Sequence, residues 1–319
     1  MTSIESQRRV SAVIRAYNEG AHIGRLLKGL AQQTVPVDEI VVVDSGSEDD
    51  TVAIAESAGC TIVPIAKSDF SFGRALNRGC AAATGDVLLF ASAHVYPVYD
   101  TYVEHILGAF DRAGVAIAYG RQVGDHRTKF SESRVMLKWF PTENIWDQGH
   151  PFSNNANAAI LRSAWQESPY DESLTGLEDL DFAKKAMERG HKVAYVADAP
   201  VVHVHEESWS ITRNRYRREA MAYARIEDGT KMSVPRAAGL ALSNIAGDYV
   251  DAAKEGRFRA NAVSIPLFRS AQFLGAWEGF RKPEDASARL LERFYYPAEK
   301  RGREVPAEPG RKIVYSDDN

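Results

Sequence analysis

The stretch EIVVVDSGSEDDTVAIAESAGCTIVPI, residues 39–65, has the pattern of a strand, a helix and a second strand in direct succession. Its first apolar run ends at Asp44, and small and acidic residues then lead into apolar residues at helical spacing. Because a helix between two apolar strands is typical of a parallel sheet, this stretch predicts a β-α-β unit. The same alternation extends from residue 10 to the apolar run DVLLFA, residues 86–91. The predicted fold class is α/β, with a mostly parallel sheet flanked by helices.

This alternation loosens after about residue 115, and the chain becomes helical and rich in arginine from about residue 208. The last stretch is polar and contains three prolines, which is typical of a flexible segment. We therefore predict an α/β domain over residues 1–207, a helical C-terminal extension over 208–296 and a flexible tail over 297–319.

Composition limits the function classes. Of the 319 residues 45% are hydrophobic, which is enough for a substantial core, and the net charge of -4 gives no sign of nucleic-acid binding. The two cysteines, Cys60 and Cys80, are too few for a disulfide scaffold or a cysteine-based zinc site. We find neither a secretory signal at the N-terminus nor an apolar stretch of about 18 residues, so we expect a cytoplasmic protein.

Several familiar sites are missing from the sequence. No G-x-G-x-x-G follows the first predicted strand, and no G-x-x-x-x-G-K-[ST] occurs, which argues against a dinucleotide site of the usual kind and against a P-loop. The absence of G-x-S-x-G weakens a serine-hydrolase interpretation.

Carboxylates stand at two informative places. Asp44 ends a predicted strand, where it can accept hydrogen bonds from a base or a ribose hydroxyl, whereas helix capping explains Ser47 and Asp49 equally well. Glu178 and Asp179 lie in the first turn of a predicted helix. They can stabilise the helix dipole there, or one of them can act as a general base.

Histidine and arginine supply further candidates. His203 and His205 lie two residues apart late in a predicted strand, beside two glutamates, and are candidate ligands of a divalent metal. Arg74 and Asn77 lie one helical turn apart and either contact phosphate or begin a solvated helix. The basic and aromatic residues of the C-terminal helices suit peripheral membrane contact, a homodimer interface or a lid over an acceptor substrate equally well.

Four motifs in order resemble glycosyltransferase family 2, whose members transfer sugars from nucleotide donors and have the GT-A fold. The resemblance covers residues 8–207 and divides them into a nucleotide-binding half, about 8–114, and an acceptor half, about 115–207. It does not cover the helical C-terminal part. The four motifs are VIRAYNEGAHIGRLLKGLAQQT, EIVVVDSGSEDDT, ATGDVLLFASAH and GLEDLDFAKKAMERGHKVAYVADAPVVHVH.

The resemblance implies roles for individual residues. Asp179 is implied as the catalytic base, with Glu178 as the neighbouring candidate. Asp44 falls on the carboxylate that contacts the base, and Arg74 falls near the position that approaches the diphosphate. The residues implied to line the nucleotide pocket are Ala16, Tyr17 and Glu19. The polar side chains placed to bind acceptor hydroxyls are Asn154, Asn155 and Asn157.

The sequence departs from the family where the fourth strand ends. Family members usually have Asp-x-Asp there, with a metal-binding carboxylate, but this chain has Ser92-Ala93-His94. We place Ser92 at the donor and expect His94 to share a divalent metal with His203 or His205. Imidazole ligands favour Mn²⁺ over Mg²⁺. Alternatively, His94 hydrogen-bonds the diphosphate directly.

The predicted reaction is transfer of a sugar from a nucleotide-diphosphate donor to a hydroxyl of a saccharide or lipid-linked acceptor, with inversion, in glycan or polysaccharide biosynthesis. One alternative is a metal-dependent hydrolase that uses His203 and His205. Another is a non-catalytic relative that binds a nucleotide or a carbohydrate. The location that follows is cytoplasmic, with peripheral contact at the inner face of the membrane as an option.

Overall fold

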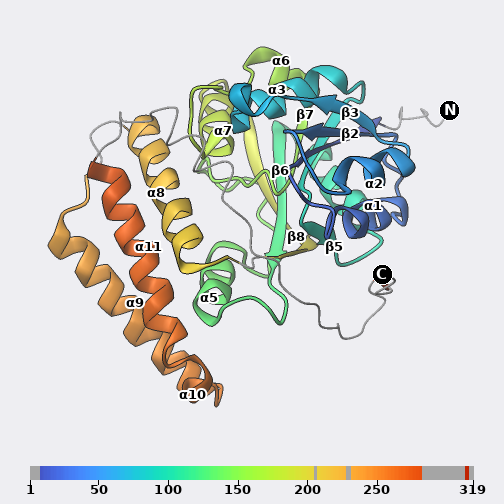
Figure 1. Cartoon of the computed structure of the whole chain (residues 1–319). Coiled ribbons are helices and arrows are strands. Elements are labelled where there is room, and N and C mark those ends of the chain that lie inside the picture. The colour runs from blue at the N-terminus through green and yellow to red at the C-terminus, as the bar shows by residue number, and fades with distance from the viewer. Residues whose placement is uncertain (1–7, 205–206, 228–230, 282–312, 316–319) are drawn as a thin grey trace.

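A computed structural model describes residues 8–204, 207–227, 231–281 and 313–315. In these residues eight strands form one sheet, in the order β3-β2-β1-β4-β7-β6-β8-β5, and the C-terminal helices form a separate lobe beside it (Figure 1). The strands are β1 (Val10–Ala16), β2 (Glu39–Asp44), β3 (Thr61–Pro64), β4 (Val87–Ser92), β5 (Val95–Pro97), β6 (Val115–Val123), β7 (Asn157–Leu161) and β8 (Lys192–His203). The α-helices are α1 (Ile23–Ala31), α2 (Thr51–Ser57), α3 (Phe72–Ala82), α4 (Tyr102–Gly108), α5 (Phe130–Trp139), α6 (Arg162–Glu167), α7 (Glu178–Glu188), α8 (Trp209–Ile226), α9 (Val234–Lys254), α10 (Phe258–Asn261) and α11 (Ser264–Arg281).

Helices cover both faces of the sheet, as the sequence predicted. Successive residues of β1 point to opposite faces, so that Ile14 packs with α1 and α4 while Val13 packs with α3. On the first face α1 contributes a stripe of leucines at helical spacing, and on the second face α7 contributes Phe182 and two alanines. The strands are buried on both sides, which explains why they read as continuous apolar runs.

Strand direction divides the sheet into two halves. β1, β2, β3 and β4 are parallel, as the β-α-β pattern predicted. Beyond β4 the sheet is mixed, because β7 is antiparallel to both β4 and β6, and β5 is antiparallel to β8. β6 and β8 are again parallel, so the chain has the predicted α/β fold with a mostly parallel sheet and a helical C-terminal part.

The C-terminal helices pack closely on one another. A Cβ atom at Gly275 of α11 would overlap the carbonyl oxygen of Arg213 in α8, and one at Gly279 would overlap that of Arg217. Glycine at these two positions therefore lets the two helix backbones approach. α9 is joined to α11 by a buried ion pair, in which Arg269 Nε lies 2.7 Å from Asp248 Oδ2.

Part of the predicted flexible tail is packed. Within 297–319 the structure describes residues 313–315, where the backbone N–H of Ile313 donates to the carbonyl of Val98 at 3.3 Å. Tyr315 donates its hydroxyl hydrogen to the carbonyl of Pro97 at 2.7 Å. These three residues therefore pack beside β5, and flexibility of the rest of 297–319 stays a prediction. In the described ranges no helix has both the length and the apolar character needed to cross a membrane.

Candidate active site

The loops that follow β1 and β2 are joined at the carboxyl edge of the parallel strands. The backbone N–H of Glu19 donates to Thr51 Oγ1 at 2.7 Å, and that of Gly20 donates to Asp49 Oδ2 at 2.9 Å. Asn18, which precedes Glu19, has a left-handed backbone with φ of 51°, unusual for a residue with a side chain. Ligands of open α/β sheets bind at this edge, so the fixed loops define a candidate site.

Asp44 orders the turn that follows β2. Its carboxylate accepts hydrogen bonds from the backbone N–H groups of Gly46 and Ser47 and from the Ser47 hydroxyl. The side chain is buried at the strand end, in the predicted position. These contacts give Asp44 a structural role in the turn, and its contact with a nucleotide base stays a prediction.

His94 and His203 face one another across the end of the sheet, although 109 positions separate them in the sequence. Their Nε2 atoms are 3.1 Å apart. Glu19 Oε1 lies 2.8 Å from His94 Nδ1, and Gln122 Oε1 lies 2.7 Å from His203 Nδ1. The structure thus brings together His94, His203 and Glu19, all candidates from the sequence, whereas His205 lies outside the described residues.

The carboxylate of Glu19 is an acceptor, so His94 Nδ1 is a donor. At His203 the proton follows the orientation of the Gln122 amide: with Oε1 at Nδ1 both neutral rings direct an Nε2 lone pair at the other, and with the amide turned His203 Nε2–H donates to His94 Nε2. Two facing lone pairs at 3.1 Å repel one another unless a cation lies between them. Burial disfavours charge on His94, but Glu19 outweighs burial and holds the pKa of His94 above its ordinary value.

The cation between the two rings can be a proton or a metal ion. Two ligands at about 2.1 Å from one metal ion lie roughly 3.0 to 3.4 Å apart, which matches the separation of the two Nε2 atoms. Imidazoles whose second nitrogen is bonded to a carboxylate or an amide are typical metal ligands. His94 and His203 thus offer two imidazole ligands, and the described residues contain no group of three or more metal-binding side chains.

The second part of the site lies at the start of α7. The backbone N–H of Asn155 donates to Asp179 Oδ2 at 3.1 Å, and that of Leu180 donates to Oδ1 at 2.8 Å. Glu178 beside it is buried and forms an ion pair with Arg15, whose Nη1 atom lies 3.1 Å from Glu178 Oε1. Leu177, which precedes both carboxylates, has φ of 54°, and such left-handed residues often occur at functional sites.

The electrostatics of Asp179 differ from those of an ordinary surface aspartate. Burial, followed by the negative charge of Glu178, raises the pKa of Asp179 to about 7, against the opposing effect of hydrogen bonds and Arg15. The positive charge of Arg15 also opposes the rise in the pKa of His94, so both groups lie within its reach. Arg15 on β1 therefore links the carboxylates to the histidine pair in one site.

Other predicted residues have structural partners. Arg74 Nε lies 2.7 Å from Glu172 Oε2, and its Nη1 donates to the carbonyl of Asp69 at 2.8 Å. The contact of Arg74 with a diphosphate stays a prediction, since this ion pair would have to open. Asn77 bonds the backbone of Tyr170, so the phosphate interpretation of Asn77 is wrong for this structure.

The nucleotide-side candidates lie where the sequence placed them. Ala16 and Asp44 pair in register at the ends of β1 and β2, and Ser92 ends β4. Tyr17 follows Ala16, and Lys67 Nζ lies 4.8 Å from the centre of its ring.

The three asparagines before β7 differ in accessibility. Asn157 is fully buried and donates from Nδ2 to the carbonyls of Arg121 and Ala199, so the expectation that it contacts the acceptor is wrong. Asn155 is also buried and holds Asp179 through its backbone. Asn154 is partly exposed and keeps the predicted role open.

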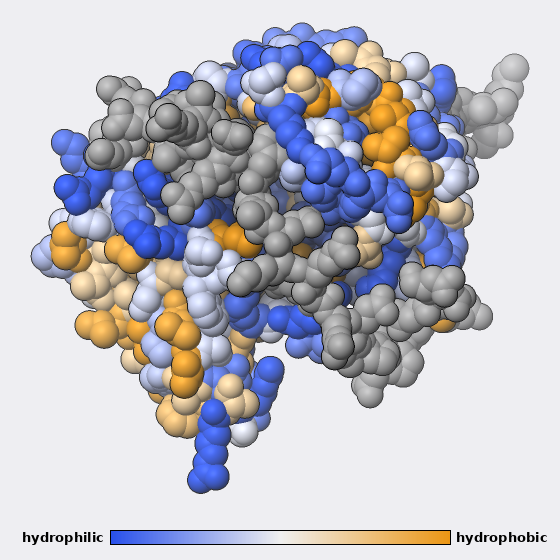
Figure 2. Space-filling model, in the orientation of Figure 1, coloured by the Kyte–Doolittle hydropathy of each residue, from blue (hydrophilic) through white to orange (hydrophobic). Residues whose placement is uncertain are grey.

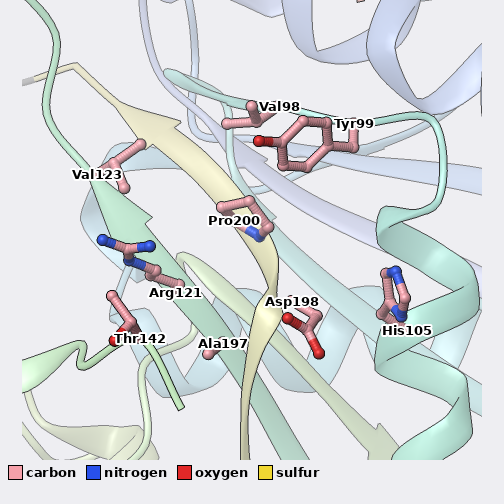
Figure 3. Close-up of a pocket in the computed structure, with 9 residues that line it drawn as sticks. All are labelled: Val98, Tyr99, His105, Arg121, Val123, Thr142, Ala197, Asp198 and Pro200. Carbon is pink, nitrogen blue, oxygen red and sulfur yellow. The ribbon is translucent and has the colours of Figure 1, made fainter. Parts of the chain in front are cut away.

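A cavity of about 530 Å³ lies at the edge of the sheet and contains none of the predicted site residues (Figure 3). Residues of β6 and β8, of α4 and of the segment that follows β5 line it. The hydrogen-bonded carboxylates and histidines, rather than this cavity, define the candidate active site. The residues that line the cavity are Val98, Tyr99, His105, Arg121, Val123, Thr142, Ala197, Asp198 and Pro200.

Comparison with known proteins identifies the family. The model of the family described as Glycosyl transferase family 2 matches residues 11–168. The chain belongs to glycosyltransferase family 2. The matched segment includes the loops after β1 and β2 and the His94 end of β4, but not α7 or the C-terminal helices. As a family 2 glycosyltransferase the chain is a transferase enzyme, and neither a hydrolase nor a non-catalytic binding protein is favoured.

Two curated relatives of this glycosyltransferase are named O-antigen chain rhamnosyltransferases. It is 28% identical over 210 residues to the O-antigen chain rhamnosyltransferase RfbN of Salmonella typhimurium. The matched residues cover 62% of this chain and 67% of the relative. It is 27% identical over 205 residues to the O-antigen chain rhamnosyltransferase WbaN of Salmonella anatum, which covers 60% and 65%. The matches thus span about two thirds of each relative.

Solved structures share the fold of this glycosyltransferase. The mannosyltransferase PcManGT from Pyrobaculum calidifontis, solved with GDP-Man and Mn²⁺, covers 92% of this chain and 89% of its own, with 18% identity and a TM-score of 0.59. Glucosyl-3-phosphoglycerate synthase from Mycobacterium tuberculosis, solved with phosphoglyceric acid, covers 72% and 84%, with 21% identity and a TM-score of 0.53. At these identities the likeness establishes the GT-A fold.

Sequence reasoning missed three residues that complete the site of this glycosyltransferase. In the sequence Arg15 is one charged residue in an otherwise mostly apolar strand, and Gln122 has no feature that sets it apart from other strand residues. Arg218 of α8 lies outside the matched segment, yet its guanidinium carbon is 4.8 Å from the ring centre of Phe72, on which Arg15 also packs at 4.7 Å. The polar interruption of β1 by Arg15 was the one available signal, because buried charges in strands require a partner.

Proposed function

We propose that this glycosyltransferase moves a sugar from a nucleotide-diphosphate donor to a hydroxyl of a saccharide or lipid-linked acceptor, with inversion, in glycan biosynthesis. The observation that carries the proposal is the carboxylate of Asp179, held by two backbone N–H groups and with its pKa raised to about 7. A general base works best when its pKa is close to the working pH.

In this mechanism Asp179 accepts the proton of the acceptor hydroxyl while the oxygen attacks the anomeric carbon. The backbone contacts at Asn155 and Leu180 aim the carboxylate, so that its position costs little reorganisation when the acceptor binds. Arg15 pairs with the carboxylate of Glu178, and the negative charge of Glu178 helps to raise the pKa of Asp179.

The histidine pair serves the leaving nucleotide. His94 and His203 would hold a divalent metal, which would supply positive charge to the diphosphate. With two imidazoles as ligands we favour Mn²⁺ over Mg²⁺, which prefers oxygen ligands. Glu19 and Gln122 orient the two rings whether the site holds a metal or a proton.

The comparisons suggest the first substrates to test. Because both Salmonella relatives are named rhamnosyltransferases of O-antigen chains, a nucleotide-linked rhamnose is the first donor, and a growing bacterial polysaccharide is the first acceptor. Thermal shifts with UDP, GDP and dTDP, each with Mn²⁺, Mg²⁺ or chelator, would identify the base and the metal together. We also propose that residues 1–207 carry the transfer reaction and that 208–296 form an extension with a separate contact role.

Replacement of Asp179 by asparagine tests the proposed base. Asp179→Asn keeps the shape of the side chain but removes the proton acceptor, so we expect kcat to fall by about 10²- to 10⁴-fold while nucleotide affinity stays nearly unchanged. The measurement is donor turnover, followed as release of the nucleoside diphosphate.

The same turn of α7 supplies a matched control. Asp181 is paired with Lys185 at 2.6 Å, so Asp181→Asn makes the same chemical change without removing the proposed base. We expect this variant to keep its turnover within a few-fold of the wild type. Wild-type turnover in Asp179→Asn would show that another group is the base.

A further inference from the structure

The distal end of the C-terminal helices, where α10 leads into α11, exposes large apolar side chains. Val263 is 71% exposed, and Phe258 and Leu267 are each 43% exposed. In Figure 1 this end projects at the lower left, away from the sheet. Figure 2 shows apolar residues gathered on the same lobe, with hydrophilic residues at its outermost point. Apolar residues gathered on a surface indicate contact with another molecule or phase.

Positive charges surround these apolar residues. Lys254, Arg257 and Arg259 are all exposed. The acidic residues nearby in the sequence, Asp251 and Glu255, both form ion pairs with Arg134 of α5, and Asp251 lies 3.7 Å from the Arg134 Nε atom. Lys254 and Arg257 reach the same two acids only at 3.8 and 3.7 Å. Among the described residues here, four positive charges thus face the two negative charges of Asp251 and Glu255, which leaves an excess of positive charge. The four cations are Arg134, Lys254, Arg257 and Arg259.

This end of the lobe is held in place by packing beneath it. The ring centres of Tyr249 and Phe258 are 5.1 Å apart, and the Tyr249 hydroxyl donates to the carbonyl of Ala262 at 2.7 Å. The Arg257 guanidinium carbon lies 5.4 Å from the ring centre of Phe130. Ile265 beneath the surface is completely buried. The exposed side chains are thus presented on a fixed support.

The charge distinguishes between the candidate partners. In a symmetric dimer the same patch meets itself, so the cations of one copy would face those of the other. An anionic bilayer instead offers phosphates to the cations and acyl chains to the apolar side chains. Because no described helix is suited to span a membrane, contact at the bilayer surface is the mode that fits.

We propose that this end of the lobe docks the enzyme on the surface of an anionic lipid bilayer. The apolar side chains enter the headgroup region, and the arginines and the lysine contact lipid phosphates. We call this surface the tip patch. It consists of Lys254, Arg257, Phe258, Arg259, Val263 and Leu267.

Vesicle sedimentation of the full chain tests the proposal. The assay contains neither donor nor acceptor, so its outcome does not depend on the transfer reaction. We expect binding to vesicles that contain phosphatidylglycerol, little binding to phosphatidylcholine alone, and weaker binding as salt screens the charges. Arg259→Glu changes the charge by two, and each charge near an anionic surface is worth about fivefold, so affinity should fall roughly 25-fold.

Matched variants separate the tip patch from the rest of the surface. Val263→Glu places a negative charge in the patch, whereas Val314→Glu makes the same change at a 77% exposed valine beside β5. For the arginine the control is Arg236→Glu, about 27 Å from Lys254 along α9. We expect the tip variants to lose vesicle binding and both controls to keep it, with unchanged thermal unfolding in all four.

Three results would overturn the proposal. The first is no binding to anionic vesicles at low salt. The second is equal loss of binding in Val263→Glu and Val314→Glu. The third is that Val263→Glu or Arg259→Glu changes the oligomeric state in light scattering but leaves vesicle affinity unaltered. That result would assign the tip patch to contact with a second copy of the chain.

Discussion

Replacement of Glu178 by glutamine should shift the pH dependence of sugar transfer. In the wild type the carboxylate of Asp179 must be unprotonated to act as base, and its pKa of about 7 places the acid limb of the rate profile there. Transfer should therefore fall about tenfold per pH unit below the limb and level off above it. Glu178→Gln removes a negative charge beside Asp179, so the pKa of Asp179 should fall.

The size of the shift follows from the causes of the raised pKa. Burial is the larger cause and Glu178 the second, and only the second is removed by the substitution. The ion pair with Arg15 is also lost, so the guanidinium charge then favours ionisation of Asp179. Both changes lower the pKa of Asp179, and a neighbouring charge of this kind is typically worth one unit or more. The limb should move down by about one pH unit, with a lower plateau because the base is weaker.

The assay is kcat/KM for transfer, measured between about pH 5 and pH 9 with the metal held saturating. Asp181→Asn in the same helical turn is the control and should keep the wild-type limb, because Asp181 is paired with Lys185 rather than with Asp179. An unchanged limb in Glu178→Gln, or a limb moved to higher pH, would refute the reasoning that Glu178 tunes the base.

Three further predictions concern metal binding and stability. His94→Ala should weaken metal-dependent donor binding by tenfold or more in titration calorimetry, and an unchanged metal response would mean that a proton joins the two histidines. Gly275→Ala should destabilise the fold by about 1–3 kcal/mol in urea unfolding, since the new methyl group overlaps a carbonyl of α8, whereas Gly247→Ala, with open space around it, should stabilise α9 by about 0.5–1 kcal/mol. Arg269→Met should cost about 3–5 kcal/mol by leaving Asp248 charged and buried, and Arg269→Met with Asp248→Leu should recover most of that loss.

The parallel half of the sheet could be predicted because each of its strands is a short apolar run followed by a helical pattern. Periodicity identifies strands but carries no information on their direction. The antiparallel placement of β7 between β4 and β6 was therefore beyond a single sequence. The same limit applies to Val95–Pro97, which looks like an irregular end of β4 but pairs with β8. In both places tertiary pairing, rather than local pattern, decides the structure.

The candidate site was predictable where one residue type suffices for the chemistry. The two carboxylates at the start of α7 and the histidine at the end of β4 were visible as polar residues at strand and helix ends. Asn157 is also a polar residue at a strand end, but its side-chain nitrogen donates to two backbone carbonyls inside the protein. The residue type does not tell whether an asparagine side chain is buried in this way. Asn77 was misjudged for the same reason, since its partners in the 170–172 loop are about 95 positions away.

The two imidazoles give the strongest reason to treat separate motifs as one site. His94 follows one strand and His203 ends another, and neither residue alone is more than a polar end to an apolar run. The structure shows both Nδ1 atoms committed to acceptors and both Nε2 atoms turned toward each other at 3.1 Å. Nε2 atoms at this separation suit a shared proton or a metal ion between the rings. A positive charge held there would lie at the sheet edge where a departing diphosphate needs it.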